Sequence, residues 1–236
     1  SSVSYNYVKD VHWNGGAEGG FLTYGFVVRV GSLQKVHHNR ITGIKNTDPA
    51  GQTLGLRITG PRVYHNSVRL IGAHANLVTT GISLDGGDCR NNIFSNELVG
   101  PTAVNTRGIN AAAGTFDNNA IFSNGVPVSG TTTWAAALGA DPAHNAKSVY
   151  GPVFFAVDLH VDSTQASSAT KIGQPNLLFD KDIDGQTLSV TAPDAGADEY
   201  PAGPLLAADI FPCSIPSPVT GTPAGLPVAV KVLVKN

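Results

Sequence analysis

Methionine is absent from this 236-residue chain, and cysteine occurs only twice. Because position 1 is a serine and no initiating methionine is present, we expect a mature or trimmed piece of a longer chain. Two cysteines leave the redox compartment undecided. No apolar run approaches the roughly 18 residues that a membrane-spanning helix needs, so we expect no membrane span.

Charge is also scarce, at 14% of residues, with a net charge of −2 and a pI near 6.3. Without an excess of positive charge, nucleic acid is not an expected partner. The missing Leu-x-x-Leu-x-Leu pattern argues against a leucine-rich repeat. The repeats described below are instead rich in glycine, asparagine, threonine, valine and isoleucine, which disfavours helical repeats and fits an exported protein.

A short pattern recurs four times: an apolar residue, two variable residues, an asparagine, a variable residue and an apolar residue. Its copies are Val36–Ile41, Val63–Val68, Cys89–Phe94 and Phe116–Ile121. The asparagines Asn39, Asn66, Asn92 and Asn119 recur at spacings of 27, 26 and 27 residues, and a glycine-apolar pair precedes each of the last three by 11 residues. Such self-similarity at a fixed period is the signature of a repeat architecture.

Apolar and polar residues alternate within the repeats, as in Leu56–Ile58 and Ile82–Leu84, which predicts short strands. Strands repeated at this period predict an all-β fold, a right-handed parallel β-helix (solenoid), in which equivalent residues stack about 4.8 Å apart. The four asparagines would then form an internal ladder, since each amide can donate to one rung and accept from the other. Asparagine also tolerates left-handed backbone geometry. Four exposed turn asparagines are the alternative.

Cys89 occupies the same place in the pattern as Val36, Val63 and Phe116. This equivalence predicts that its thiol acts as a small buried apolar group. A disulfide between Cys89 and Cys213 is the alternative.

The chain divides by composition into several stretches. We expect an irregular incoming rung at residues 1 to about 24, and the clear rungs lie at residues 25 to about 130. A loop or short helix is expected at 131–146. We expect a closing segment at 150–200, because the end of a solenoid exposes apolar core and strand edges that need a cap. We therefore expect the C-terminal part of a β-helix at 1–200. A proline-rich linker and the first strands of a β-sandwich follow at 201–236.

The closing segment carries the motifs Asp158–Val161, Ser167–Ala169, Asp182–Gly185 and Pro193–Tyr200. Together they resemble the terminal rungs of secreted bacterial right-handed parallel β-helix proteins of the pectate-lyase-like group. The resemblance implies an extracellular or bacterial cell-surface location. It also implies further domains of a longer chain, beginning with an immunoglobulin-like module after residue 200. Catalytic and non-catalytic members share this closure, so it implies an architecture rather than an activity.

If the repeats stack, the residues four and two positions before each asparagine point outward from one strand face. These two columns are Lys35, Arg62, Asp88 and Thr115, and His37, Tyr64, Arg90 and Asp117. Polysaccharide lyases of this fold neutralise a uronate carboxylate with cations and remove the α-proton with a base. Our catalytic candidates are therefore Lys35, Arg62 and Arg90 at the carboxylate, with Tyr64 or His37 as base. The alternative is an ordinary solvated face with weak ion pairs.

The run Asp180–Gly185 matches the first half of a calcium loop, with Asp180, Asp182 and Asp184 as candidate Ca²⁺ ligands. The glutamate expected at position 12 of such a loop is Thr191, so other ligands would have to complete the site. A turn without metal is the alternative. His38 and His65, which precede ladder asparagines, predict either a two-histidine metal site or stacked turn residues. No other cofactor is expected.

Three classes of function remain. The leading hypothesis is an extracellular bacterial surface or secreted module that serves as stalk, adhesin or glycan-binding surface. The second is a polysaccharide lyase that cleaves acidic glycans by β-elimination. The third is a structural filament subunit, since the ends of a solenoid can stack. A polysaccharide or cell-surface glycan is the expected partner of the first two.

Overall fold

The computed structural model describes residues 2–13, 22–29, 34–48, 50–60, 62–72, 78–98, 106–130, 147–162, 164–175 and 177–199. The chain forms two compact units, Ser1–Tyr200 and Pro201–Asn236. All described residues belong to the first unit. The linker and partial sandwich expected at 201–236, Cys213, and the loop or helix expected at 131–146 therefore lie outside the described residues.

Parallel strands form two large sheets and one small sheet. Sheet A contains β1 (Ser2–Ser4), β4 (Leu22–Arg29), β5 (Lys35–His37), β8 (Gln52–Thr59), β9 (Arg62–Tyr64), β11 (Val78–Arg90), β13 (Thr106–Asp117) and β15 (Val126–Gly130). Sheet B contains β2 (Tyr7–Lys9), β6 (Arg40–Thr42), β10 (Ser67–Leu70), β12 (Ile93–Asn96), β14 (Ala120–Ser123) and β16 (Val149–Tyr150). The small sheet pairs β3 (His12–Trp13) with β7 (Lys45–Asn46), and η3 (Val157–Leu159) is a short 3-10 turn.

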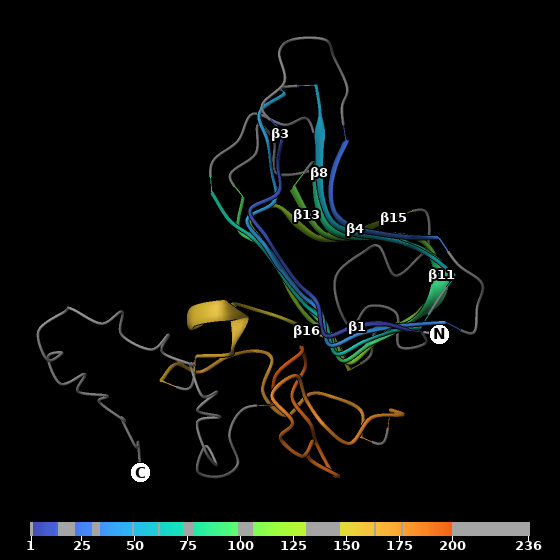
Figure 1. Ribbon diagram of the computed structural model, residues 1–236, viewed down its shortest axis with the longest axis vertical. Coiled ribbons are helices and arrows are strands. Elements are labelled where there is room, and N and C mark those ends of the chain that lie inside the picture. The colour runs from blue at the N-terminus through green and yellow to red at the C-terminus, as the bar shows by residue number, and fades with distance from the viewer. Residues whose placement is uncertain are drawn as a thin grey trace, which may run out of the picture. The chain divides into compact units, whose positions relative to one another are not determined.

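Each rung runs from sheet A into sheet B, and its strands pair with those of the rungs before and after it. For example, β9 lies between β5 and β11, while β10, which follows β9 in the chain, lies between β6 and β12. The strands of successive rungs lie over one another in Figure 1. This arrangement confirms the all-β fold and the parallel β-solenoid that the repeat predicts.

The described part of the incoming rung, residues 2–13, is regular, whereas we expected an irregular rung at residues 1 to about 24. Residues 2–13 form β1, β2 and β3, which pair in parallel register with β5, β6 and β7. The reason is visible in the sequence, because Val3, Asn6 and Val8 repeat the pattern of the later rungs. The spacing of 33 from Asn6 to Asn39, longer than the 26 or 27 of the later repeats, conceals this copy.

A ladder of buried asparagine side chains runs through the turn between the two sheets. The Nδ2 groups of Asn39, Asn66 and Asn92 each donate to the Oδ1 of the next ladder asparagine, at 2.9, 2.9 and 3.0 Å. Asn6 adds a further step at the start by donating to Asn39 at 2.9 Å. Each buried amide is satisfied by a neighbouring rung, so loss of one side chain would leave partners unpaired at a cost of about 1–3 kcal/mol each.

The left-handed backbone lies one residue before each ladder asparagine, and not at the asparagine itself. Tyr5, His38, His65, Asn91 and Asn118 have φ between 51° and 58°. This conformation turns the chain sharply, so that the asparagine side chain enters the ladder. Our expectation that the ladder asparagines themselves supply the left-handed geometry is therefore wrong.

A column of glycines allows neighbouring rungs to approach closely in sheet A. A Cβ added at Gly25, Gly55 or Gly81 would lie 2.6, 2.6 or 2.5 Å from the carbonyl oxygen of the next glycine in the column. These contacts are shorter than any side chain tolerates. The glycine of the repeated glycine-apolar pair is therefore required by packing.

The solenoid interior is apolar and made of stacked columns. One column contains Val36, Val63, Cys89 and Phe116, a second contains Ile41, Val68, Phe94 and Ile121, and a third contains Leu56, Ile82 and Ile109. All of these side chains are fully buried. Cys89 is a free thiol within the first column. Each large side chain contributes about 1.5–3 kcal/mol through burial.

The closing segment (residues 150–199) packs along the outside of sheet B, and the described residues do not cover a solenoid end as we expected. A second apolar core joins Ile93 and Ala120 from sheet B to Val153, Val161, Ala169 and Ala195 of the closing segment. The segment, drawn in yellow to orange in Figure 1, lies outside the stack of strands. We expected this segment to cap an end of the solenoid. It lies along the side instead, because the outer face of sheet B is itself apolar at Ile93 and Ala120.

Candidate functional site

The two columns that we expected to carry chemistry are aligned along β5, β9, β11 and β13. Lys35, Arg62, Asp88 and Thr115 are in register with one another, as are His37, Tyr64, Arg90 and Asp117. We refer to these eight residues as the outer strip. Their side chains point away from the solenoid interior, because the residues between the two columns belong to the inner core.

The closing segment covers the middle of the outer strip. The ring of Phe179 lies 4.0 Å from the imidazole of His37, measured between centroids, and 6.4 Å from the ring of Tyr64. As a result His37 is only 6% exposed and Tyr64 only 3% exposed. The two residues that we considered as a catalytic base are therefore buried.

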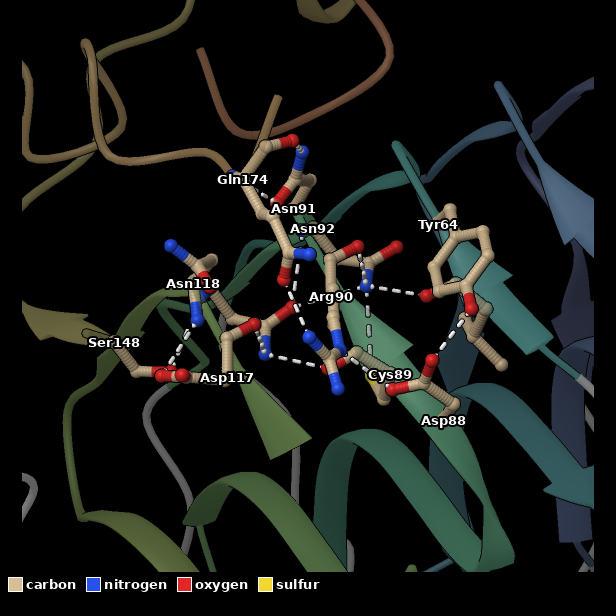
Figure 2. A network of polar contacts seen from close by, with 12 residues as sticks. Tyr64, Asp88, Cys89, Arg90, Asn91, Asn92, Asp117, Asn118, Ser148 and Gln174 are labelled. Atoms are coloured by element: carbon tan, nitrogen blue, oxygen red, sulfur yellow. Dashed lines mark hydrogen bonds and ion pairs between the residues drawn. The ribbon is translucent and has the colours of Figure 1, made fainter. Parts of the chain in front are cut away.

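Asp88 connects Tyr64 to Arg90 (Figure 2). Its Oδ2 accepts a hydrogen bond from the Tyr64 hydroxyl, and its Oδ1 accepts one from Arg90 Nε at 2.7 Å. Burial, together with the Asp88 carboxylate, raises the pKa of Tyr64 far above its usual value. The phenol therefore stays protonated at neutral pH, and Arg90 is engaged by a neighbouring carboxylate.

The end of the strip is also tied to the closing segment. Arg90 Nη1 donates to Gln174 Oε1, and Gln174 exchanges two backbone hydrogen bonds of 2.8 and 2.7 Å with the Asn91 side chain (Figure 2). Asp117 accepts hydrogen bonds from the backbone N–H groups of Asn118 and Lys147. These contacts give Arg90 and Asp117 structural roles.

Two cations of the strip keep contact with solvent. Lys35 and Arg62 lie side by side on β5 and β9 and are partly exposed. The Lys35 ammonium lies 5.6 Å from the centroid of Phe179, a geometry that places it over the ring face. These side chains offer positive charge at the rim of the covered region.

The geometry of the strip disfavours proton abstraction by His37 or Tyr64. A general base must reach its proton and have a pKa near the working pH. Burial, with a smaller contribution from the nearby Lys35, lowers the pKa of His37 to about 4. The pKa of Tyr64 is shifted in the opposite direction, upward, so its hydroxyl stays protonated. The hydroxyl is also buried and hydrogen-bonded to Asp88.

The two histidines of the left-handed turn column are stacked. The rings of His38 and His65 are 5.2 Å apart with an interplanar angle of 5°, and Tyr5 stacks on His38 at 5.3 Å. Both histidines are buried, and burial lowers the pKa of each. His38 Nδ1 lies 2.9 Å from His37 Nδ1, and His65 Nε2 lies 3.2 Å from Asn91 Nδ2. The two rings therefore stack, as the stacked-turn alternative expects.

The three aspartates expected to bind Ca²⁺ have different surroundings. Asp182 is buried, and its carboxylate accepts hydrogen bonds from the backbone N–H groups of Asp184, Gln186 and Glu199, at 2.9, 2.7 and 3.1 Å. Asp184 instead faces His160, whose Nε2 lies 2.7 Å from its Oδ2. Asp180 is exposed and is not part of this cluster. Of the three aspartates, only Asp184 belongs to the group of possible metal ligands that the described residues form.

No protein-family model, curated protein or solved structure matches this chain. No helix among the described residues is long and apolar enough to cross a membrane.

Sequence reasoning missed the residues that close the outer strip. Phe179 and Gln174 lie 142 and 84 residues away in the chain from the strip residues that they cover, His37 and Arg90. Neither belongs to a repeat, so no periodic signal placed them there. The apolar run Leu177-Leu178-Phe179 within a polar, turn-rich segment was the one available clue.

Proposed function

We propose that this chain is a non-catalytic β-helix module of an extracellular bacterial surface or secreted protein, and that it binds acidic glycans at the outer strip. The observation that carries this proposal is the position of Phe179. It buries His37, one of the two candidate bases, while the neighbouring cations Lys35 and Arg62 stay partly exposed. Carboxylate recognition needs positive charge at the surface, whereas β-elimination also needs an accessible base.

The rest of the fold fits a stalk or adhesin that presents such a surface. The asparagine ladder and the two apolar cores fix each rung to the next. Lys35 and Arg62, on paired strands, are therefore held about 4.8 Å apart at the backbone. The extracellular location is supported by the motifs of the closing segment that resemble secreted bacterial β-helix proteins.

Binding of a soluble uronate polysaccharide to the purified chain tests the proposal by affinity electrophoresis or calorimetry. The double variant Lys35→Ala/Arg62→Ala should bind at least about tenfold more weakly, which corresponds to about 1.4 kcal/mol. The matched control is Lys45→Ala, because Lys45 is an exposed lysine on β7, outside the strip. Binding by the wild type should also weaken with added salt.

Ultraviolet absorbance of the same mixtures separates binding from cleavage. We expect no growth of the unsaturated-uronate signal, with or without Ca²⁺. A growing signal that Tyr64→Phe abolishes would instead establish a lyase. Unchanged binding by the double variant would refute the assignment of the glycan site to the outer strip.

A further inference from the structure

Three side chains capable of metal binding converge within the closing segment. His160 follows η3, Asp184 lies in the Asp182–Gly185 turn, and Asp198 lies in the last described stretch. One imidazole nitrogen and one oxygen from each carboxylate all lie within 4.8 Å of one another. The three residues are 24 and 14 positions apart in the chain, so only the tertiary fold brings them together.

Asp198 is the buried carboxylate of this cluster. It is 4% exposed, and its Oδ2 accepts a long hydrogen bond of 3.4 Å from the backbone N–H of Val161. Among the described residues no lysine or arginine pairs with Asp198 or Asp184. A buried carboxylate normally requires a partner of opposite charge.

Asp182 fixes the backbone at Asp184 and next to Asp198. One of its oxygens accepts the N–H of Asp184, and the other accepts the N–H of Glu199, the neighbour of Asp198. Asp182 is therefore a positioning residue whose carboxylate is already engaged by the backbone. Ligand side chains fixed by outer hydrogen bonds of this kind are characteristic of built metal sites.

We propose that His160, Asp184 and Asp198 bind one divalent transition-metal ion of the Zn²⁺ class. An imidazole nitrogen combined with two carboxylate oxygens suits Zn²⁺ and its neighbours, whereas Ca²⁺ prefers oxygen ligands alone. The side chains of His160 and Asp184 are 34% and 42% exposed, so an ion can enter and water can complete its coordination. The bound ion would replace the direct contact between His160 and Asp184 and neutralise Asp198.

Such an ion would join three separate parts of a segment that has little regular secondary structure. Because the unfolded chain lacks the assembled ligands, binding would stabilise the folded state. This role does not depend on glycan binding at the outer strip. The two proposals can therefore fail separately.

Titration of the chelator-treated full chain with Zn²⁺ tests the site, by calorimetry and by thermal melting. We expect one ion per chain and a higher melting temperature in the presence of Zn²⁺. His160→Ala and Asp184→Asn should each weaken binding at least about tenfold. Both replaced side chains are partly exposed, so the variants should fold, which their melting without metal will show. Asp180→Asn is the matched control and should bind Zn²⁺ as the wild type does.

Two results would overturn the proposal. One is the absence of saturable Zn²⁺ binding, and the other is binding that both His160→Ala and Asp184→Asn leave unchanged, because the ion would then lie elsewhere. Ca²⁺ binding that Asp180→Asn abolishes, without Zn²⁺ binding, would restore the all-oxygen site. Co²⁺ provides a second readout, since its visible absorption reports nitrogen and oxygen ligands and should be lost in His160→Ala.

Discussion

The residue before each ladder asparagine takes a left-handed backbone, and its side chain changes along the solenoid. His38 and His65 occupy this position in the rungs that Phe179 contacts, while Asn91 and Asn118 occupy it in the next two rungs. Asparagine and histidine both tolerate the left-handed region better than most residues. The difference between the rungs is that the two imidazoles also contact Phe179 of the closing segment.

Replacement of His65 by asparagine should remove a pH-dependent part of the stability. Burial, and to a smaller extent His37, lowers the pKa of His65 to about 4, whereas the unfolded chain titrates near 6.5. Between pH 4 and pH 6.5 the unfolded state binds more protons at His65 than the folded state does. The stability that the neutral, buried His65 contributes is therefore complete above pH 6.5 and is lost as the pH falls toward 4. The loss should approach about 2–3 kcal/mol.

Urea unfolding of wild type and His65→Asn across this pH range measures the effect. The difference between the two free energies of unfolding cancels the contributions of His37, His38 and other shared groups. His12→Asn, which replaces an exposed histidine on β3, is the control for histidine replacement itself. A difference that stays constant from pH 4 to pH 7 would contradict the prediction.

Columns of residues could be predicted from the sequence, but their surroundings could not. The registers of Asn39 with Asn66 and of Cys89 with Val63 follow from a period that is visible in the chain. The burial of Tyr64 does not, because strand alternation places its side chain outside the solenoid and only the distant closing segment covers it. A repeat in the sequence predicts which residues of neighbouring rungs contact one another. It does not predict where a non-repetitive segment, such as the closing segment, packs.

At the scale of elements, the closing segment replaces strand pairing with side-chain carboxylates. Backbone N–H groups that lack a ladder need other acceptors when they are buried. Glu199 accepts the N–H groups of Ser189 and Asp194 at 3.2 and 2.9 Å, and Asp194 accepts that of Lys171 at 2.6 Å. The acidic motifs near residue 199, which the sequence relates to a closure, therefore act as internal acceptors.

Gly196 marks the closest approach of this segment to sheet B. Its φ is +104°, and an added Cβ would lie 2.5 Å from Ile93 Cδ1 and 2.8 Å from Ser67 Oγ. Gly196→Ala should therefore destabilise the protein by about 2–4 kcal/mol, through both the clash and the unfavourable backbone. Limited proteolysis should then cut the closing segment faster than it does in the wild type.

The variant Gly72→Ala separates the cost of the unfavourable backbone from the cost of the steric clash. Gly72 has a similar φ of +115°, but an added Cβ would meet nothing within 4 Å. The control should lose only the conformational contribution, about 1–2 kcal/mol. Equal losses in urea unfolding of the two variants would show that the contact of Gly196 with sheet B is unimportant.

At the scale of the whole described unit, the closing segment connects rungs that do not contact one another. In a simple solenoid each rung contacts only its neighbours, so the ends can open independently. Here Asp158 accepts hydrogen bonds from Tyr7 and Arg40 in the first two rungs, and Ile172 accepts one from Asn118 near the other end. Ala197 is bonded to Ser67 in the middle. One segment therefore ties together five successive rungs.

This connection predicts cooperative opening of the solenoid. In the wild type, the backbone amides of β2, β10 and β14 should exchange with solvent hydrogen through one global opening and show similar protection. Weakening the attachment with Gly196→Ala should lower protection in β2 and β14 by at least about tenfold more than in the central β10, because the end rungs then open on their own. Hydrogen exchange followed by mass spectrometry resolves these strands, with Gly72→Ala as the control. A uniform loss of protection across all three strands would mean that the rungs cooperate through the asparagine ladder and inner core alone.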